Sequence, residues 1–166
     1  PDHVGLLCLC PAARGGLSRI VNMVAVLEVM NKQFPDLVPR LYQPYFFDRQ
    51  REHSDMDEKT IFTPLLSDED GSLRVRVSRN LIYQGYALEG KVIDETSETA
   101  LATFFSIIDD PKMYIEFQFE SGQIQFLNNR LIGHKRTGFQ DPPNTTMKRH
   151  LLRIWLRQKG SSFYNG

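Results

Sequence analysis

The chain has 166 residues, of which 41% are hydrophobic and 24% are charged, so it is long enough to bury one sizeable core. Twenty basic residues balance twenty acidic ones, which argues against nucleic acids or membrane surfaces as partners held by bulk charge. No apolar run approaches the roughly 18 residues of a membrane helix. Cys8 and Cys10 lie too close together for a comfortable disulfide, which favours a reducing, cytoplasmic setting.

The first third of the chain predicts one strand, one helix and one loop. Val4 to Cys10 is a continuous apolar run of strand length that ends before Pro11. From Met23 to Phe34, apolar residues recur at helical spacing after a plausible N-cap at Asn22. Residues 43–59 are first aromatic and then polar, so we expect an exposed loop that serves as a lid over the substrate.

The rest of the chain is mostly β in pattern. Ile61–Leu66 and Leu73–Val77 predict a hairpin, and Ser97–Ile108 carries an apolar stripe at helical spacing. Strict alternation predicts a strand over Met113–Phe119, and Ser121-Gly122 turns the chain into a second run at Gln123–Leu127.

A last strand is expected over Lys148–Leu156, where Arg149 and Arg153 share one face. These elements together predict an α+β fold that is mainly β, an antiparallel sandwich or barrel with flanking helices in a single domain over 1–166.

Three stretches carry a family resemblance. Gly122–Phe139, Lys148–Leu156 and Leu6–Ser18 resemble, in consistent order, the C-terminal portion of the Fe(II)/2-oxoglutarate-dependent dioxygenases of the taurine dioxygenase (TauD/TfdA) and clavaminate synthase-like family. That family has a glycine turn into a strand, an Asn-Arg pair, a metal-binding His four residues later, and an Arg on the final strand. The matching residues here are Gly122, Asn129, Arg130, His134 and Arg149.

The resemblance implies a double-stranded β-helix (jelly roll) and a set of site residues. His134 matches one of the three iron ligands, in a type of site that leaves positions open for 2-oxoglutarate and dioxygen. Arg149 matches the arginine that holds the far carboxylate of 2-oxoglutarate, for which a planar guanidinium is well suited. Ser18 matches a hydroxyl residue on the same carboxylate, and Arg153 a second arginine near the co-substrate or the substrate.

Each assignment has a structural alternative. A lone histidine between strands is more often a satisfied core or surface residue than a ligand, and arginines on an apolar strand often extend to solvent at a barrel rim. Cys8 and Cys10 are assigned no role, since Cys-x-Cys alone is a weak metal signal. His150 points away from Arg149 and is expected to be a packing or surface residue.

The family's first metal motif, His-x-Asp/Glu, would precede the strand at Val4–Cys10, so the other two ligands and the first strands of the domain are expected upstream of Pro1. His53-Ser54-Asp55 fits the bare formula but follows Gly15-Gly16 inside a charged loop, which indicates coincidence.

The resemblance implies an enzyme with Fe(II) and the co-substrate 2-oxoglutarate, which it converts to succinate and CO2 while hydroxylating a small metabolite; Arg153 would favour an anionic one. The partners expected are a small-molecule substrate, with no nucleic acid and no membrane; a homo-oligomer is left open. Two alternatives remain at this stage: a non-catalytic jelly-roll binding or scaffold domain, and a structural β domain of unrelated function.

Overall fold

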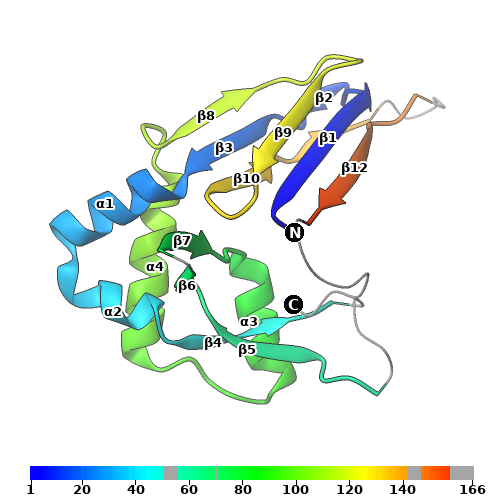
Figure 1. Cartoon of the computed structure of the whole chain (residues 1–166). Helices are drawn as coiled ribbons and strands as arrows, with labels where there is room; N and C mark the ends of the chain where they lie inside the picture. Colours follow the sequence, from blue (N-terminus) through cyan, green and yellow to red (C-terminus); the bar gives the residue numbers. More distant parts are fainter. Residues whose placement is uncertain (51–55, 70, 142–146, 158–166) are drawn as a thin grey trace. The chain divides into compact units, whose positions relative to one another are not determined.

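A computed structural model describes residues 1–50, 56–69, 71–141 and 147–157 (Figure 1). The described chain forms two compact units. Of the described residues, unit 1 contains 1–23, 109–141 and 147–157, and unit 2 contains 24–50, 56–69 and 71–108. Unit 1 holds every residue that the sequence assigns to the site.

The first sheet of unit 1 has the strand order β12-β1-β9 (Figure 1). Its central strand β1 (His3–Cys10) pairs antiparallel with β12 (His150–Leu156) on one side and with β9 (Ile124–Asn128) on the other. The pairing of β1 with β12 shifts register between Cys8 and Cys10, where the strand bulges.

The second sheet of unit 1 has the order β10-β3-β8. Here β3 (Ser18–Asn22) lies between β10 (Ile132–Arg136) and β8 (Tyr114–Phe117), again antiparallel. A short pair continues it, formed by β2 (Arg14–Gly15) and β11 (Phe139–Gln140).

The two faces of the β12-β1-β9 sheet differ in character. Register places Arg153 and Gln125 on either side of Leu6, so all three share one face, which also carries the buried Val4 and Cys8. The opposite face is apolar yet exposed among the described residues: it carries Leu9, Ile124, Phe126, Leu152, Ile154 and Leu156.

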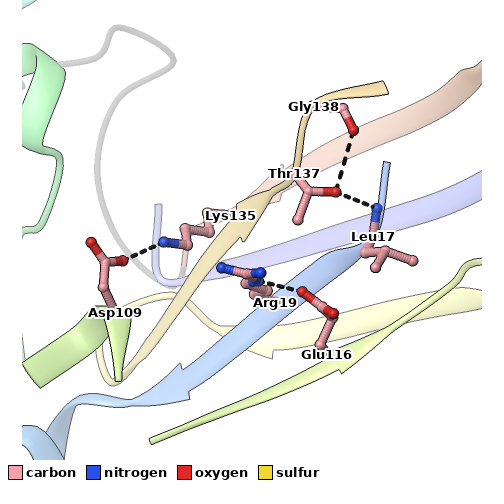
Figure 2. A network of polar contacts seen from close by, with 7 residues as sticks. All are labelled: Leu17, Arg19, Asp109, Glu116, Lys135, Thr137 and Gly138. Carbon is pink, nitrogen blue, oxygen red and sulfur yellow. Dashed lines mark hydrogen bonds and ion pairs between the residues drawn. The ribbon is translucent and has the colours of Figure 1, made fainter. Parts of the chain in front are cut away.

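The outer face of the β10-β3-β8 sheet carries charged pairs (Figure 2). Arg19 pairs with Glu116, and Lys135 pairs with Asp109. Beyond them, the backbone N–H of Leu17 donates to Thr137 Oγ1 at 2.9 Å and fixes the end of β10 against β3. Since side chains alternate along a strand, Ser18 and His134, the neighbours of Arg19 and Lys135, point to the other face.

Unit 2 combines helices with two hairpins. Helix α1 (Met23–Gln33) leads through the short η1 (Pro35–Leu37) and α2 (Val38–Leu41) to β4 (Pro44–Asp48), which pairs with β5 (Thr60–Pro64). A second hairpin joins β6 (Leu66–Glu69) and β7 (Ser72–Val75), and helices α3 (Arg79–Leu88) and α4 (Glu95–Asp109) follow.

Close packing between two elements of unit 2 explains why residue 85 is a glycine. A Cβ at Gly85 of α3 would lie 2.5 Å from the Phe46 carbonyl oxygen of β4, so no larger residue fits there without moving backbone. Elsewhere in unit 2, Met30, Leu101 and Phe104 are fully buried in its core. None of the described helices has the length and apolar character needed to cross a membrane.

The structure confirms the strand at Val4–Cys10, the helices at Met23–Phe34 and Ser97–Ile108, and the strand at Lys148–Leu156, with small differences at their ends. The strand runs at 113–119 and 123–127 are also present as β8 and β9. They do not form a hairpin, however, because β8 pairs with β3 and β9 with β1. Helix α3 was not predicted.

Two further expectations concern the loop region and hairpin of unit 2. A hairpin is present, but Ser67–Glu69 belong to strand β6 and the first predicted run divides at Leu65, so β5 pairs with β4 while β6 pairs with β7. Within residues 43–59, Pro44–Asp48 form strand β4 rather than loop. The lid role of 43–59 stays a prediction, and His53-Ser54-Asp55 lies outside the described residues.

Candidate functional site

A hydrogen bond links the two sheets of unit 1 and marks the interior between them. Ser18 Oγ on β3 donates to Gln125 Oε1 on β9 at 3.0 Å, and both residues are buried. The face of each sheet that carries one of these residues is therefore its inner face. Predicted site residues lie on both inner faces.

His134 lies on β10 opposite Ile20, two residues from the position opposite Ser18, so it shares the inner face with Ser18. Its side chain reaches solvent, but the protein around the ring lowers the pKa of the His134 imidazole, and the positive charge of Arg153 lowers it further. A depressed pKa keeps the ring neutral near pH 7, which is the form that binds a metal ion.

Arg153 lies on β12, on the inner face of the other sheet, beside Trp155. Its guanidinium carbon is 4.4 Å from the centre of the Trp155 ring, a cation–π contact that orients it. The inner faces of the two sheets carry Arg153 and His134, and the charge of Arg153 lowers the pKa of His134.

Arg149 comes just before β12 and is half-buried. Its backbone N–H donates to Asp141 Oδ1 at 2.9 Å, which anchors the start of the strand. Its Nε would lie 3.3 Å from a Cβ added at Gly16, a residue whose φ of +70° already favours glycine. Glycine at this position therefore lets Arg149 approach the chain two residues before Ser18.

Two arginines lie near the ring of Phe139. The guanidinium carbon of Arg136 is 4.2 Å from the ring centre, and that of Arg149 is 5.4 Å away. Burial and the nearby charge of Arg136 both lower the pKa of Arg149, although a guanidinium stays protonated at any physiological pH. Two neighbouring cations with one nearby carboxylate, Asp141, favour an anionic ligand.

The site thus has a closed end and an open end. Ser18, Gln125 and Gly16 are buried at the closed end, where Arg149 is half-buried, while His134 and Arg153 are exposed. Such an arrangement can hold a small dianion by one end and present its other end to a metal ion at His134.

The remaining motif residues have structural contacts. Arg130 Nε pairs with Asp2 Oδ1 at 2.9 Å, and Asn129 Nδ2 donates to the Pro1 carbonyl at 3.3 Å, so both hold the turn after β9 to the start of β1. Cys8 and Cys10 are both free thiols, and burial raises the pKa of Cys8. His150 is exposed, as expected.

Metal binding can be tested against the donor set. His134 offers one imidazole nitrogen on the inner face, which suits an iron site. Within the described residues, no three histidine, cysteine or carboxylate side chains gather into a group that could hold a metal ion. The chain therefore shows one fitting ligand, and its arginines and buried donors fit a dicarboxylate.

Sequence reasoning did not identify two residues of this site, Arg136 and Gln125. Arg136 could have been found, since it follows His134 by two residues in a strand and so must share its face. Gln125 stands between Ile124 and Phe126, and its burial inverts the usual pattern because its apolar neighbours are 69% and 58% exposed.

Comparisons with known proteins place these observations in a family. The family model for taurine catabolism dioxygenase TauD, TfdA family, matches residues 1–155. Among curated relatives, FR-33289 synthase of Streptomyces rubellomurinus is 28% identical over 98% of this chain and 49% of its own length. The taurine hydroxylase-like protein SAT17 of Stachybotrys chartarum is 32% identical over 91% of this chain and 39% of its own.

Solved structures show the same fold. An asparagine oxygenase in complex with Fe(II), 3-hydroxyasparagine and succinate matches with a TM-score of 0.68 and 21% identity, over 92% of this chain and 44% of that one. A taurine dioxygenase from Burkholderia xenovorans matches with a TM-score of 0.65 and 19% identity, over 92% and 51%.

The chain spans about half the length of the curated relatives it matches. The two antiparallel sheets of unit 1, together with these neighbours, confirm the mainly β fold of the jelly-roll dioxygenases. Because the family model matches nearly the whole sequence, the chain belongs to the TauD/TfdA family of dioxygenases.

Proposed function

We propose that the protein carrying this chain is an Fe(II)- and 2-oxoglutarate-dependent oxygenase that hydroxylates a small anionic substrate. The observation that supports the proposal is that Ser18 and His134 share the inner face of one sheet, and Ser18 bonds to Gln125 of the facing sheet. The charge of Arg153, on that facing sheet, lowers the pKa of His134. Family membership and relatives solved with iron and succinate support it.

Each residue has a distinct role in this proposal. The imidazole of His134 provides one iron ligand, and the two others belong to a part of the protein outside these 166 residues, as the greater length of the relatives suggests. Bound iron supplies the dioxygen chemistry, in which 2-oxoglutarate is converted to succinate and CO2 and the substrate is hydroxylated. Arg149 holds the distal carboxylate of 2-oxoglutarate at the closed end.

Arg153 is the reason for proposing an anionic substrate. It lies at the open end, near His134 and held over the Trp155 ring, where a carboxylate, phosphate or sulfonate of a substrate can reach its guanidinium. An Arg153→Leu variant should therefore show a raised KM for an anionic substrate. An unchanged KM for every anionic substrate would restrict Arg153 to the co-substrate.

Succinate release by the full-length protein with Fe(II) and 2-oxoglutarate tests the proposal. We expect His134→Ala to abolish release and also to remove the rise in melting temperature that Fe(II) causes in the wild type. His150→Ala is the matched control, because His150 is exposed on the opposite face of β12. Undiminished activity in His134→Ala would overturn the ligand assignment.

A further inference from the structure

The buried amide of Gln125 has an unused donor. The residue is only 8% exposed, and its Oε1 accepts the hydrogen bond from Ser18. Its Nε2 has no hydrogen-bond partner among the residues that the structure describes. A buried donor left without a partner is costly, so its retention indicates a ligand that uses it.

The Gln125 amide lies at the closed end of the site. Gln125 shares an inner face with Arg153, because both lie opposite Leu6. Its hydrogen-bond partner Ser18 lies two residues after Gly16, which packs against Arg149. The amide is thus next to the segment that Arg149 contacts.

Ser18 and Gln125 differ in whether a hydrogen is left to donate to a ligand. A serine hydroxyl carries one hydrogen, and that of Ser18 is given to Gln125 Oε1. An ionised carboxylate only accepts hydrogen bonds, so Ser18 in this arrangement has nothing to donate to it. The free donor of the pair is the Gln125 amide.

We propose that Gln125 binds the co-substrate: its Nε2 donates to the 2-oxoglutarate carboxylate that Arg149 holds, and Ser18 is the positioning residue that orients the amide. This inference rests on the proposed function. It changes the expectation for Ser18, which acts through Gln125 rather than on the carboxylate itself.

Anaerobic calorimetric titration of 2-oxoglutarate into the full-length protein with Fe(II) tests this. In Gln125→Met, which keeps the side-chain length without polar atoms, Kd should rise about 10- to 100-fold, the range for one hydrogen bond to a charged group. The melting temperature without 2-oxoglutarate should stay nearly the same, because the unpaired amide N–H is removed while the Ser18 hydroxyl, which loses its acceptor, becomes unpaired in its place. A purely structural role predicts the reverse, a lower melting temperature with unchanged Kd.

Further variants keep the test decisive. Should Gln125→Met fail to fold, Gln125→Glu replaces the donor by an acceptor and should weaken binding at least as much. Ser18→Ala should raise Kd in the wild type but not further in Gln125→Met. Wild-type Kd in a folded Gln125 variant would overturn the inference alone, whereas absence of 2-oxoglutarate binding in the wild type would overturn the proposed function with it.

Discussion

Unit 2 buries Phe104, Met30 and Leu101 completely, whereas the interior of unit 1 contains Ser18, Gln125 and the approach to Arg149. In unit 1, several large apolar side chains of β9 and β12 lie instead on the exposed outer face. The interior of unit 1 thus contains buried polar groups, which our proposal assigns to a ligand, whereas these buried residues of unit 2 are apolar. Substitutions should accordingly affect binding in unit 1 and unfolding in unit 2.

The largest effect on stability is expected for Phe104→Ala in α4. Removing a fully buried phenylalanine loses its transfer free energy and leaves a cavity, so the free energy of unfolding should fall by about 3–5 kcal/mol. Urea denaturation measures it, with the exposed Val92→Ala as control. If the folded variant also binds 2-oxoglutarate more weakly, substitutions in unit 2 affect binding as well as unfolding, which contradicts the expected separation.

Arg149→Lys should mainly affect binding. Lysine keeps the charge but loses the planar fork, so Kd for 2-oxoglutarate should rise about 10- to 100-fold, with little change in melting temperature. Arg14→Lys, at an exposed position of β2, is the matched control and should bind like the wild type. Equal affinities in the two variants would show that Arg149 does not hold 2-oxoglutarate.

Ser97→Ala tests a polar cluster in unit 2. The Ser97 hydroxyl accepts from Arg40 Nε at 2.6 Å and donates to Asp94, whose carboxylate also accepts from the Ser97 backbone N–H at 2.9 Å. Loss of the hydroxyl should lower the free energy of unfolding by about 0.5–1.5 kcal/mol at pH 7.

The same variant should change the pH dependence of stability. The bonds from Ser97 lower the pKa of Asp94, so their stabilisation is present above the unfolded pKa and is lost as pH falls through the folded one. The difference between wild type and Ser97→Ala should therefore shrink below about pH 4. A difference that stays constant down to pH 2 would show that Asp94 is not involved.

The sequence predicted strand faces better than strand partners. Alternation placed Leu151, Arg153 and Trp155 on one face of β12 correctly, because parity within a strand is a local property, whereas Arg149 precedes the strand and its predicted face stays untested. Pairing is not local: β8 and β9 follow each other along the chain yet belong to different sheets. A turn at Ser121-Gly122 looks the same whether it closes a hairpin or crosses between sheets.

Prediction of the site from sequence was limited in the same way, because local motifs can be read from the sequence and tertiary contacts cannot. Motif matching proposed His134 and Arg149, but the proposed role of Gln125 has no motif behind it, and the burial of Gln125 depends on its pairing with β1. Helix α3 was missed because its interior glycine, Gly85, disfavours a helix locally and is required only by contact with β4. Tertiary contacts decide both cases.

The smallest effect on stability is expected for Tyr45→Phe. This variant tests whether a buried polar atom without a partner indicates a ligand site in general or only at Gln125. Tyr45 Oη in unit 2 is also buried without a partner among the described residues, and burial raises the pKa of Tyr45 to about 12. The Arg40 guanidinium lies 4.0 Å from the ring centre, a contact that phenylalanine keeps. Removing the hydroxyl should leave stability unchanged or raise it by up to about 1 kcal/mol, with no effect on Kd for 2-oxoglutarate. If Tyr45→Phe weakened binding as Gln125→Met should, an unpaired buried atom would no longer distinguish a ligand site from a packing imperfection.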